Sequence, residues 1–135
     1  MAKLTLIRGI PGSGKSTIAK DLQTLTECAW FEADHYFYNE SGDYNFNINN
    51  LHDAHEWCRS STKKALFNDC DVIVSNTFTT IKELKPYFEM CLELDIGYPS
   101  VITMQNNFGS IHGVPDATLD AMKKRFTYDL SPLYK

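Results

Sequence analysis

The sequence has no long apolar run, and its four cysteines form no C-x-x-C pair. A membrane-spanning helix needs about 20 consecutive apolar residues, so no membrane partner is expected. Widely spaced cysteines predict free thiols in a reducing compartment rather than a disulfide framework or a zinc site. The segment Met1-Ala2-Lys3 leads directly into an apolar strand without room for a signal peptide, so we expect a cytoplasmic protein.

Basic charge is also scarce, because the net charge is −4 and only three arginines are present. A dedicated nucleic-acid binder is more often basic, which argues against tight non-specific binding but leaves room for a local groove. Three clusters could contribute to such a groove: Lys63-Lys64, Lys82 with Lys85, and Lys123-Lys124-Arg125. Taken singly, each cluster is typical of a solvated helix face.

The order of the expected strands and helices points to one α/β domain spanning residues 1–135. Apolar runs predict strands at 3–8, 29–33, 71–75 and 100–104, and helical spacing predicts helices at 15–26, 48–68, 80–94 and 116–127. A loop is expected at 35–47, and Pro86 is expected to kink its helix. The alternation predicts a P-loop NTPase three-layer α/β/α sandwich with a parallel sheet and a short C-terminal lid. Ligands of such sheets bind at the carboxyl ends of the strands.

The segment Gly9–Ser16 matches the phosphate-binding pattern G-x-x-x-x-G-K-[ST] at every fixed position. A strand before it and a helix after it supply the context that this P-loop requires. Lys15 would reach the β- and γ-phosphates of a nucleotide, and the Ser16 hydroxyl would bind Mg²⁺. The residues expected to bind the nucleotide are Gly9, Pro11, Gly12, Ser13, Gly14, Lys15, Ser16 and Thr17.

Asp34 follows the second strand and should face the γ-phosphate side of the P-loop. Its carboxylate could accept a proton from an attacking hydroxyl or, with Ser16, hold the metal and its water. The alternative is that Asp34 only caps a turn. Glu32 is a weaker candidate, because strand alternation would direct it away from the neighbours of Asp34.

The third strand ends in Ser75-Asn76-Thr77-Phe78, where a hydrolysing ATPase more often carries an acid. Asp71 lies at the opposite end of that strand. This favours a kinase-like transfer in which Asp34 supplies the carboxylate. Arg125, on the last helix, is the first choice for a clamp on the transferred phosphate, with a surface salt bridge as its alternative.

Two groups of side chains have simpler interpretations. His52, His55 and Glu56 form an H-x-x-H-E sequence that fits no zinc motif and lacks a third ligand, so no transition-metal site is expected. Several aromatic residues could stack a base or sugar, although aromatics more often cover the core beneath a long loop. They are Phe31, Tyr36, Phe37, Tyr38, Tyr44 and Phe46.

Four blocks in order give the chain a resemblance to the polynucleotide-kinase-like P-loop kinases, which include 5′-hydroxyl polynucleotide kinases and zeta-toxin-type kinases. The blocks are residues 9–17, residues 33–37, Ala54-His55-Glu56-Trp57 followed by Ser75-Asn76-Thr77, and Ile111-His112-Gly113-Val114-Pro115. The resemblance implies that Asp34 is the catalytic base and that residues 111–115 belong to a lid. The chain departs from the family at Phe37 and Phe78, and residues 106–110 lack the lid arginine.

The sequence therefore predicts an ATP- and Mg²⁺-dependent phosphotransferase in which Lys15, Asp34 and Arg125 carry the reaction. A 5′-hydroxyl nucleic acid or a small hydroxylated molecule is the expected acceptor. An ATP-binding regulatory or adaptor protein, or a weak ATPase, remains the alternative, because the arginines typical of the family are partly missing. The absence of an Asn/Thr-Lys-x-Asp element favours ATP over GTP as the nucleotide.

Overall fold

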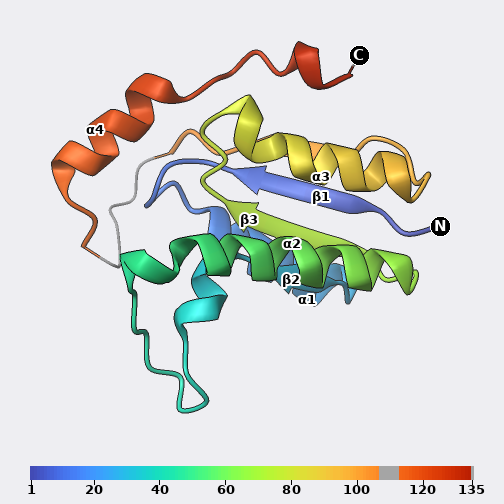
Figure 1. The fold of residues 1–135 in the computed structure, drawn as a ribbon, viewed down its shortest axis with the longest axis horizontal. Helices are drawn as coiled ribbons and strands as arrows, with labels where there is room; N and C mark the ends of the chain where they lie inside the picture. The colour runs from blue at the N-terminus through green and yellow to red at the C-terminus, as the bar shows by residue number, and fades with distance from the viewer. Residues whose placement is uncertain (107–112, 135) are drawn as a thin grey trace.

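The computed structural model describes residues 1–106 and 113–134. Four parallel strands form one sheet, in the order β2-β3-β1-β4. They are β1 (Leu4–Arg8), β2 (Ala29–Phe31), β3 (Val72–Asn76) and β4 (Ser100–Thr103). All four carboxyl ends lie at one edge of the sheet, beside α4 and the protruding segment 38–47 (Figure 1). The predicted parallel α/β fold is confirmed.

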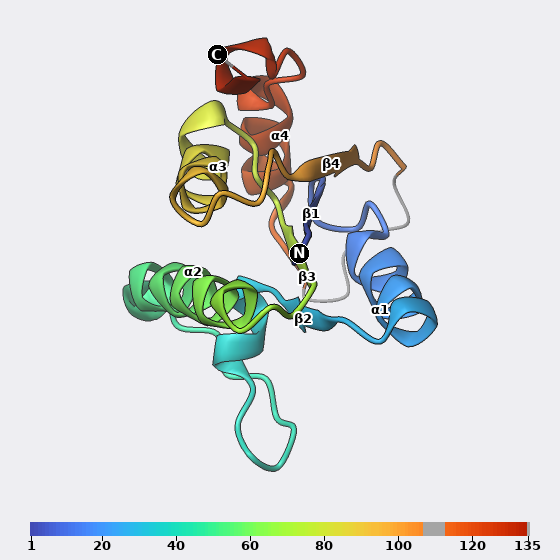
Figure 2. The ribbon, with the colours of Figure 1, turned by 90° about the vertical axis from the view of Figure 1, so that its right-hand side faces the viewer.

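Helices cover both faces of this sheet and make it the middle of three layers. They are α1 (Lys15–Thr26), α2 (Leu51–Phe67), α3 (Ile81–Glu93) and α4 (Asp116–Arg125), with 3₁₀ turns at Ala33–Phe37, Ile48–Asn50 and Ser131–Tyr134. Figure 2 shows α1 on one face and α2 with α3 on the other. None of the described helices is long and apolar enough to cross a membrane.

The alternation of side chains along β1 explains the two cores. Leu6 packs with the cluster beneath α2 and α3, whereas Ile7 packs with Ala19 of α1 and Ile73 of β3. Both β1 side chains are fully buried, so neither face of the strand is exposed to solvent. A strand buried on both faces is expected in a parallel sheet with helices on each side.

The structure differs from the predicted elements at two places that matter for the site. The second strand ends at Phe31 instead of continuing to residue 33, because a 3₁₀ turn begins at Ala33. The backbone N–H of Ala33 donates to the Asn76 side chain at 2.8 Å, which ties this turn to the end of β3. The predicted loop 35–47 contains most of that turn and an antiparallel bridge between Tyr38 and Tyr44.

The two later helices begin and end close to their predicted positions. A capping box of Thr80 and Glu83 fixes the start of α3, and the helix continues through Pro86 to Glu93. The last helix ends at Arg125, two residues before its predicted end. Of the predicted lid segment 111–115, residues 111 and 112 lie outside the described residues.

Candidate functional site

The P-loop joins the end of β1 to the start of α1, and its glycines have the geometry that a phosphate cradle needs. Gly12 and Gly14 have φ values of 84° and 89°, which are strained for residues with a side chain. At Gly9, an added Cβ would collide with the Ser13 hydroxyl and lie 3.0 Å from the Met104 carbonyl oxygen. Gly9 is therefore required for a close approach rather than for its backbone angles.

Two polar side chains of the loop have no hydrogen-bond or ion-pair partner among the described residues, as an anion-binding site would require. The buried Ser13 hydroxyl has no hydrogen-bond partner within residues 1–106 and 113–134. Lys15 forms no ion pair with any described residue, and burial lowers its pKa, an effect that the negative charges of Glu32 and Asp34 oppose. A half-buried cation beside an unpaired hydroxyl fits the phosphates of a nucleotide.

Glu32 lies at the centre of a hydrogen-bond network beside the P-loop. Its Oε2 atom accepts from the Ser16 hydroxyl at 2.9 Å and from the Ser75 hydroxyl at 2.7 Å. The Trp30 indole N–H donates to Ser75 Oγ at 2.8 Å, so the Ser75 proton is directed toward the carboxylate. On its other oxygen, Glu32 Oε1 lies 3.6 Å from His35 Nε2. Only 12% of the Glu32 side chain is exposed.

From the sequence, Glu32 was a weaker candidate than Asp34 because only the alternation of side chains along the strand was considered. Alternation does direct Glu32 to the same face as Trp30, and Trp30 packs with the cluster beneath α1. That face holds the first residues of α1, including Ser16, and Glu32 therefore contacts the P-loop serine. Trp30 and Glu32 are two residues apart, so their side chains point to the same face of the sheet, and α1 begins at the P-loop on that face. These two facts could have identified Glu32 from the sequence.

Asp34 lies in the 3₁₀ turn that follows β2, and its carboxylate accepts a hydrogen bond from the Tyr44 hydroxyl at 3.2 Å. The turn itself has no side-chain cap. The charge of Asp34 acts on both Lys15 and His35 and raises their pKa values, whereas burial lowers both. The fold thus brings Asp34 and Glu32 to the side of the P-loop that carries Lys15.

Arg125 lies where α4 ends, and its Nε atom donates to the Thr79 hydroxyl at 3.0 Å. Thr79 Oγ1 in turn donates to Glu83 at 2.6 Å, and its carbonyl oxygen accepts from the N–H of Thr127 at 2.8 Å. These bonds tie the end of α4 to the start of α3. The bond to Thr79 uses only Nε of the guanidinium. The role of Arg125 as a phosphate clamp stays a prediction.

Arg8 also contacts the junction between the end of α4 and the start of α3. Its side chain is fully buried, donates to the carbonyl oxygens of Phe78 and Thr79, and lies 4.1 Å from the centre of the Phe126 ring. Burial lowers the pKa of its guanidinium. Arg8 is the residue before the P-loop, and its side chain connects this position to the segment that follows β3 and to the end of α4. Sequence reasoning did not identify this connecting role.

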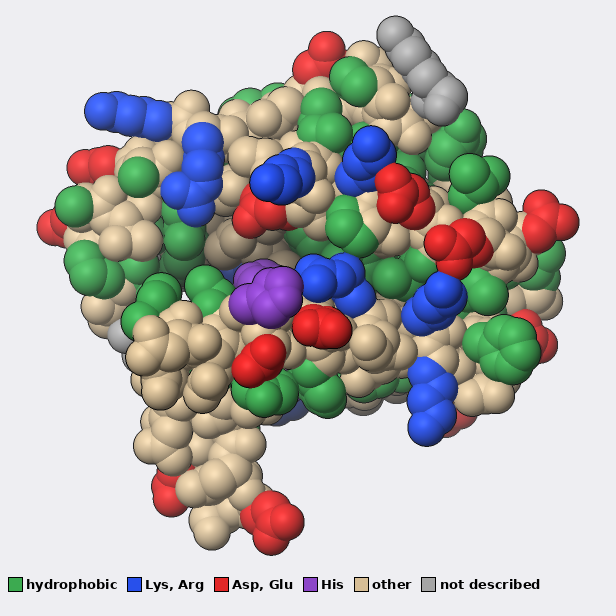
Figure 3. Space-filling view, in the orientation of Figure 1, with side chains coloured by type: hydrophobic (Ala, Val, Ile, Leu, Met, Phe, Trp, Pro, Cys, Tyr) green, Lys and Arg blue, Asp and Glu red, His purple; other side chains and the backbone are tan. Residues whose placement is uncertain are grey.

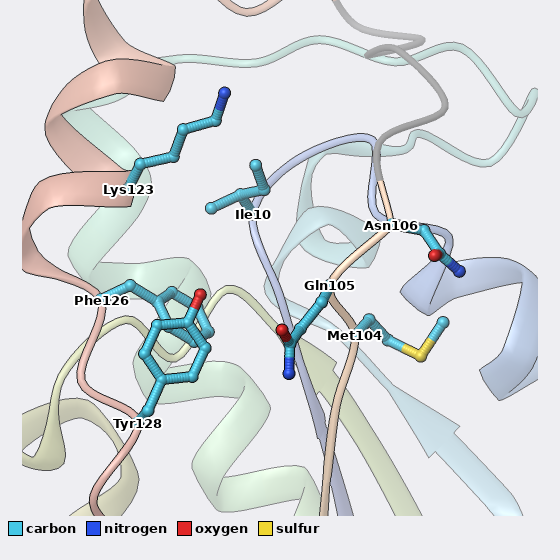
Figure 4. A pocket seen from close by; sticks show the side chains of 7 residues that line it. All are labelled: Ile10, Met104, Gln105, Asn106, Lys123, Phe126 and Tyr128. Atoms are coloured by element: carbon cyan, nitrogen blue, oxygen red, sulfur yellow. The ribbon is translucent and has the colours of Figure 1, made fainter.

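A pocket of about 250 Å³ opens on the β4 side of the P-loop. It lies between the loop, the segment after β4 and the end of α4, with the rings of Phe126 and Tyr128 side by side and the amide of Gln105 facing the same space (Figure 4). Its remaining lining residues are Ile10, Met104, Asn106 and Lys123. The two rings are 4.9 Å apart and tilted by 50°.

Basic side chains lie among acidic ones on the face formed by α2 and α3 (Figure 3). Lys63 pairs with Glu93 at 2.6 Å, and Lys85 lies 3.9 Å from Glu89. These pairs agree with solvated helix faces rather than with a continuous basic groove. Within the described part of the chain, no group of three or more His, Cys, Asp or Glu side chains could hold a metal ion.

No family profile matches the chain. A segment of 86 residues is 40% identical to human NEDD4-binding protein 2, and this match covers 62% of the chain and 5% of that protein. An uncharacterized protein from Pasteurella multocida, PM0531, is 28% identical over 127 residues, which is 84% of the chain and 70% of that protein. The chain thus corresponds to a small part of the human protein.

Solved structures show the class of fold. A chain of the Pnkp1/Rnl/Hen1 RNA repair complex has a TM-score of 0.56 and 23% identity, covering 99% of this chain and 42% of that one. A gluconokinase from Sinorhizobium meliloti has a TM-score of 0.61 and 14% identity, with 93% and 75% covered. A shikimate kinase from Acinetobacter baumannii has a TM-score of 0.53 and 15% identity, with 99% and 79% covered. This chain has the fold of the P-loop kinases.

Proposed function

We propose that the protein is an ATP- and Mg²⁺-dependent phosphotransferase that transfers the γ-phosphate to an acceptor hydroxyl. The observation that carries the proposal is that Glu32 accepts a hydrogen bond from Ser16 of the P-loop and that Asp34 lies in the adjoining turn, with both negative charges acting on the half-buried Lys15. A nucleotide-binding protein without chemistry needs the loop and the lysine but has no need for two acids at the γ-phosphate side. A kinase needs one acid near the metal and one near the acceptor.

The donor set around Ser16 fits Mg²⁺, which prefers oxygen ligands and keeps several of its waters. Ser16 Oγ donates its one proton to Glu32 and keeps its lone pairs for a metal. Ser16 would hold the ion directly, while Glu32 and Asp34 would accept hydrogen bonds from its waters. The bound ion would neutralise charge on the β- and γ-phosphates.

Each residue of the site has a separate role in the proposed reaction. Lys15 and the loop amides hold the phosphates, with the Ser13 hydroxyl as a further donor. Asp34 accepts the proton of the acceptor hydroxyl as its oxygen bonds to the γ-phosphorus. The bond from that phosphorus to the β–γ bridging oxygen breaks, and ADP leaves with the electron pair. The Phe126–Tyr128 pocket on the opposite side of the loop would receive the nucleobase.

The test is γ-phosphate transfer from ATP to 5′-hydroxyl oligonucleotides, nucleosides and small hydroxylated metabolites. Asp34→Asn should lower turnover about 10²- to 10⁴-fold, the range for loss of a general base. Asp43→Asn is the matched control, because Asp43 lies exposed on the nearby hairpin. Asp34→Asn with wild-type turnover would contradict the assigned base. A wild-type protein that transfers phosphate to none of these acceptors would contradict the function itself.

The choice of acceptor rests on similarity. The Pnkp1/Rnl/Hen1 complex is described as an RNA repair assembly, which supports a 5′-hydroxyl nucleic acid, whereas gluconokinase and shikimate kinase support a small molecule. A second candidate function, an ATP-binding regulatory or adaptor protein, is favoured by one contact. The Nε of Arg125 donates to Thr79, so one donor of this side chain serves the junction between α4 and α3 instead of a phosphate. Nucleotide-dependent partner binding with negligible transfer would support that alternative.

A further inference from the structure

The hairpin at residues 38–46 carries a polar contact to the turn that holds Asp34. The Tyr44 hydroxyl donates to Asp34 Oδ1 at 3.2 Å, across ten positions of sequence. The hairpin projects from the body at the edge where the strands end (Figure 1). Tyr44 therefore reaches back from a protruding segment to the residue proposed as the base.

Internal hydrogen bonds give the hairpin a defined shape. The Asn39 side-chain oxygen accepts from the N–H groups of Ser41 and Asp43, each at 2.9 Å. The backbone N–H of Asn39 donates to the Asp43 carbonyl oxygen at 3.0 Å. The hairpin is closed at its base by the N–H of Asn45, which donates to the Phe37 carbonyl oxygen at 2.8 Å. A hairpin fixed at both ends can hold Tyr44 in one place.

The Tyr44 ring is also held by aromatic packing. Its centre lies 5.1 Å from the Tyr38 ring and 6.4 Å from the Phe37 ring. Phe37 is buried and belongs to a small core with Ala33 and Ala54, so the packing is anchored in the body of the protein. Burial and the charge of Asp34 raise the pKa of Tyr44 further above neutral pH, so its hydroxyl is protonated and acts as the donor in this bond.

We propose that Tyr44 is a positioning residue for the general base, which rests on the phosphotransferase function proposed above. The hydroxyl occupies Oδ1 of Asp34 and leaves Oδ2 to accept the proton of the acceptor. A carboxylate that rotates freely can present either oxygen to the acceptor, and for part of the time neither oxygen is aligned with the acceptor hydroxyl. Fixing one oxygen aligns the other, and misalignment of a reacting group is costly to the rate.

The chain offers a matched pair of variants for the test. Tyr44→Phe removes the hydroxyl and keeps the ring, whereas Tyr38→Phe removes a hydroxyl that forms no hydrogen bond within the described residues, on the same hairpin. Each variant is assayed for kcat and for the KM of ATP with the best acceptor. Thermal unfolding midpoints are measured in parallel.

Tyr44→Phe should lower kcat about 10- to 100-fold, because misplacement of a reacting group by about 1 Å can cost about 100-fold in rate. The KM of ATP and the unfolding midpoint should stay close to wild-type values, because the lost bond is long at 3.2 Å and only partly buried. Tyr38→Phe should match the wild type throughout. Equal kcat in the two variants would overturn the proposal while leaving the phosphotransferase function intact. A parallel loss of kcat and thermal stability in Tyr44→Phe would also overturn it, in favour of a structural role. Absence of transfer in the wild type would reject both proposals.

Discussion

The two sides of the P-loop are built differently. On the β2 side, Glu32, Ser75 and Trp30 form a continuous chain of hydrogen bonds that ends on Ser16. On the β4 side, the pocket is lined by aromatic, aliphatic and amide side chains, and Lys123 is the one charged side chain among its described lining residues. One side is fixed and charged, and the other is open and largely uncharged.

This contrast suggests different roles for the two sides: the β2 side would position the reacting groups, and the β4 side would contribute affinity for the nucleotide. The proposed phosphoryl transfer would depend on metal ligands held at defined positions, a role that the network of the β2 side would fill. A nucleobase has two apolar faces and a polar edge, so rings and amides suffice to bind it. We therefore expect changes on the β2 side to lower turnover and changes on the β4 side to weaken binding.

The largest effect that tests the contrast is expected for Glu32→Gln. Loss of the charge beside Ser16 should lower turnover about 10- to 100-fold and raise the Mg²⁺ concentration needed for half-maximal activity, as for other residues that support metal ligands. Glu56→Gln is the control, because Glu56 lies on the exposed face of α2 and contacts only His52 among the described ion pairs.

A second measurement on Glu32 does not depend on activity. Trp30 bonds to Ser75, which bonds to Glu32, so the indole should report changes at this carboxylate. In a Trp57→Phe background, Trp30 is the sole tryptophan. Mg²⁺ with ADP should change its emission, and Glu32→Gln should remove that response. Unchanged emission and turnover in Glu32→Gln would show that the β2 network has no part in metal binding.

A smaller effect is expected from Tyr128→Ala on the β4 side. Removing one ring of the pocket should raise the Kd of ATP about 10-fold, which lies within the range of about 1–3 kcal/mol that stacking on a base contributes, while turnover at saturating ATP remains unchanged. The control is Phe67→Ala, since Phe67 is 76% exposed at the end of α2. Lower turnover with an unaltered Kd would reverse the division between the two sides.

The smallest effect concerns pH and the β2 side. Burial lowers the pKa of His35 below its ordinary value of 6.5, against the opposing charges of Glu32 and Asp34. The unfolded chain then binds more protons than the folded one below about pH 6.5, so the free energy of unfolding should fall as the pH is lowered through that range. Urea unfolding at a series of pH values should show a shallower decline for His35→Gln. Identical slopes would exclude His35 as a contributor.

The sequence was informative wherever structure depends on neighbouring residues. The strand, loop and helix around Lys15 and the alternation of strands and helices along the chain follow from local patterns, and the structure confirms these elements. Glu32 was ranked too low because its partners, Ser16 and Ser75, lie 16 and 43 positions away. No local pattern indicates that Tyr44 would meet Asp34, or that Thr79 would hold Arg125.

The sequence by itself determined that this chain has a glycine-rich loop of the phosphate-binding pattern between a buried strand and a helix, within a parallel α/β sheet. Spacing within a few residues encodes those features, because backbone geometry repeats over short distances. Only the tertiary structure decided which acid lies beside Ser16, which hydroxyl contacts Asp34 and where a pocket opens. These depend on the order of the strands and on the face to which each side chain points once distant segments have packed together.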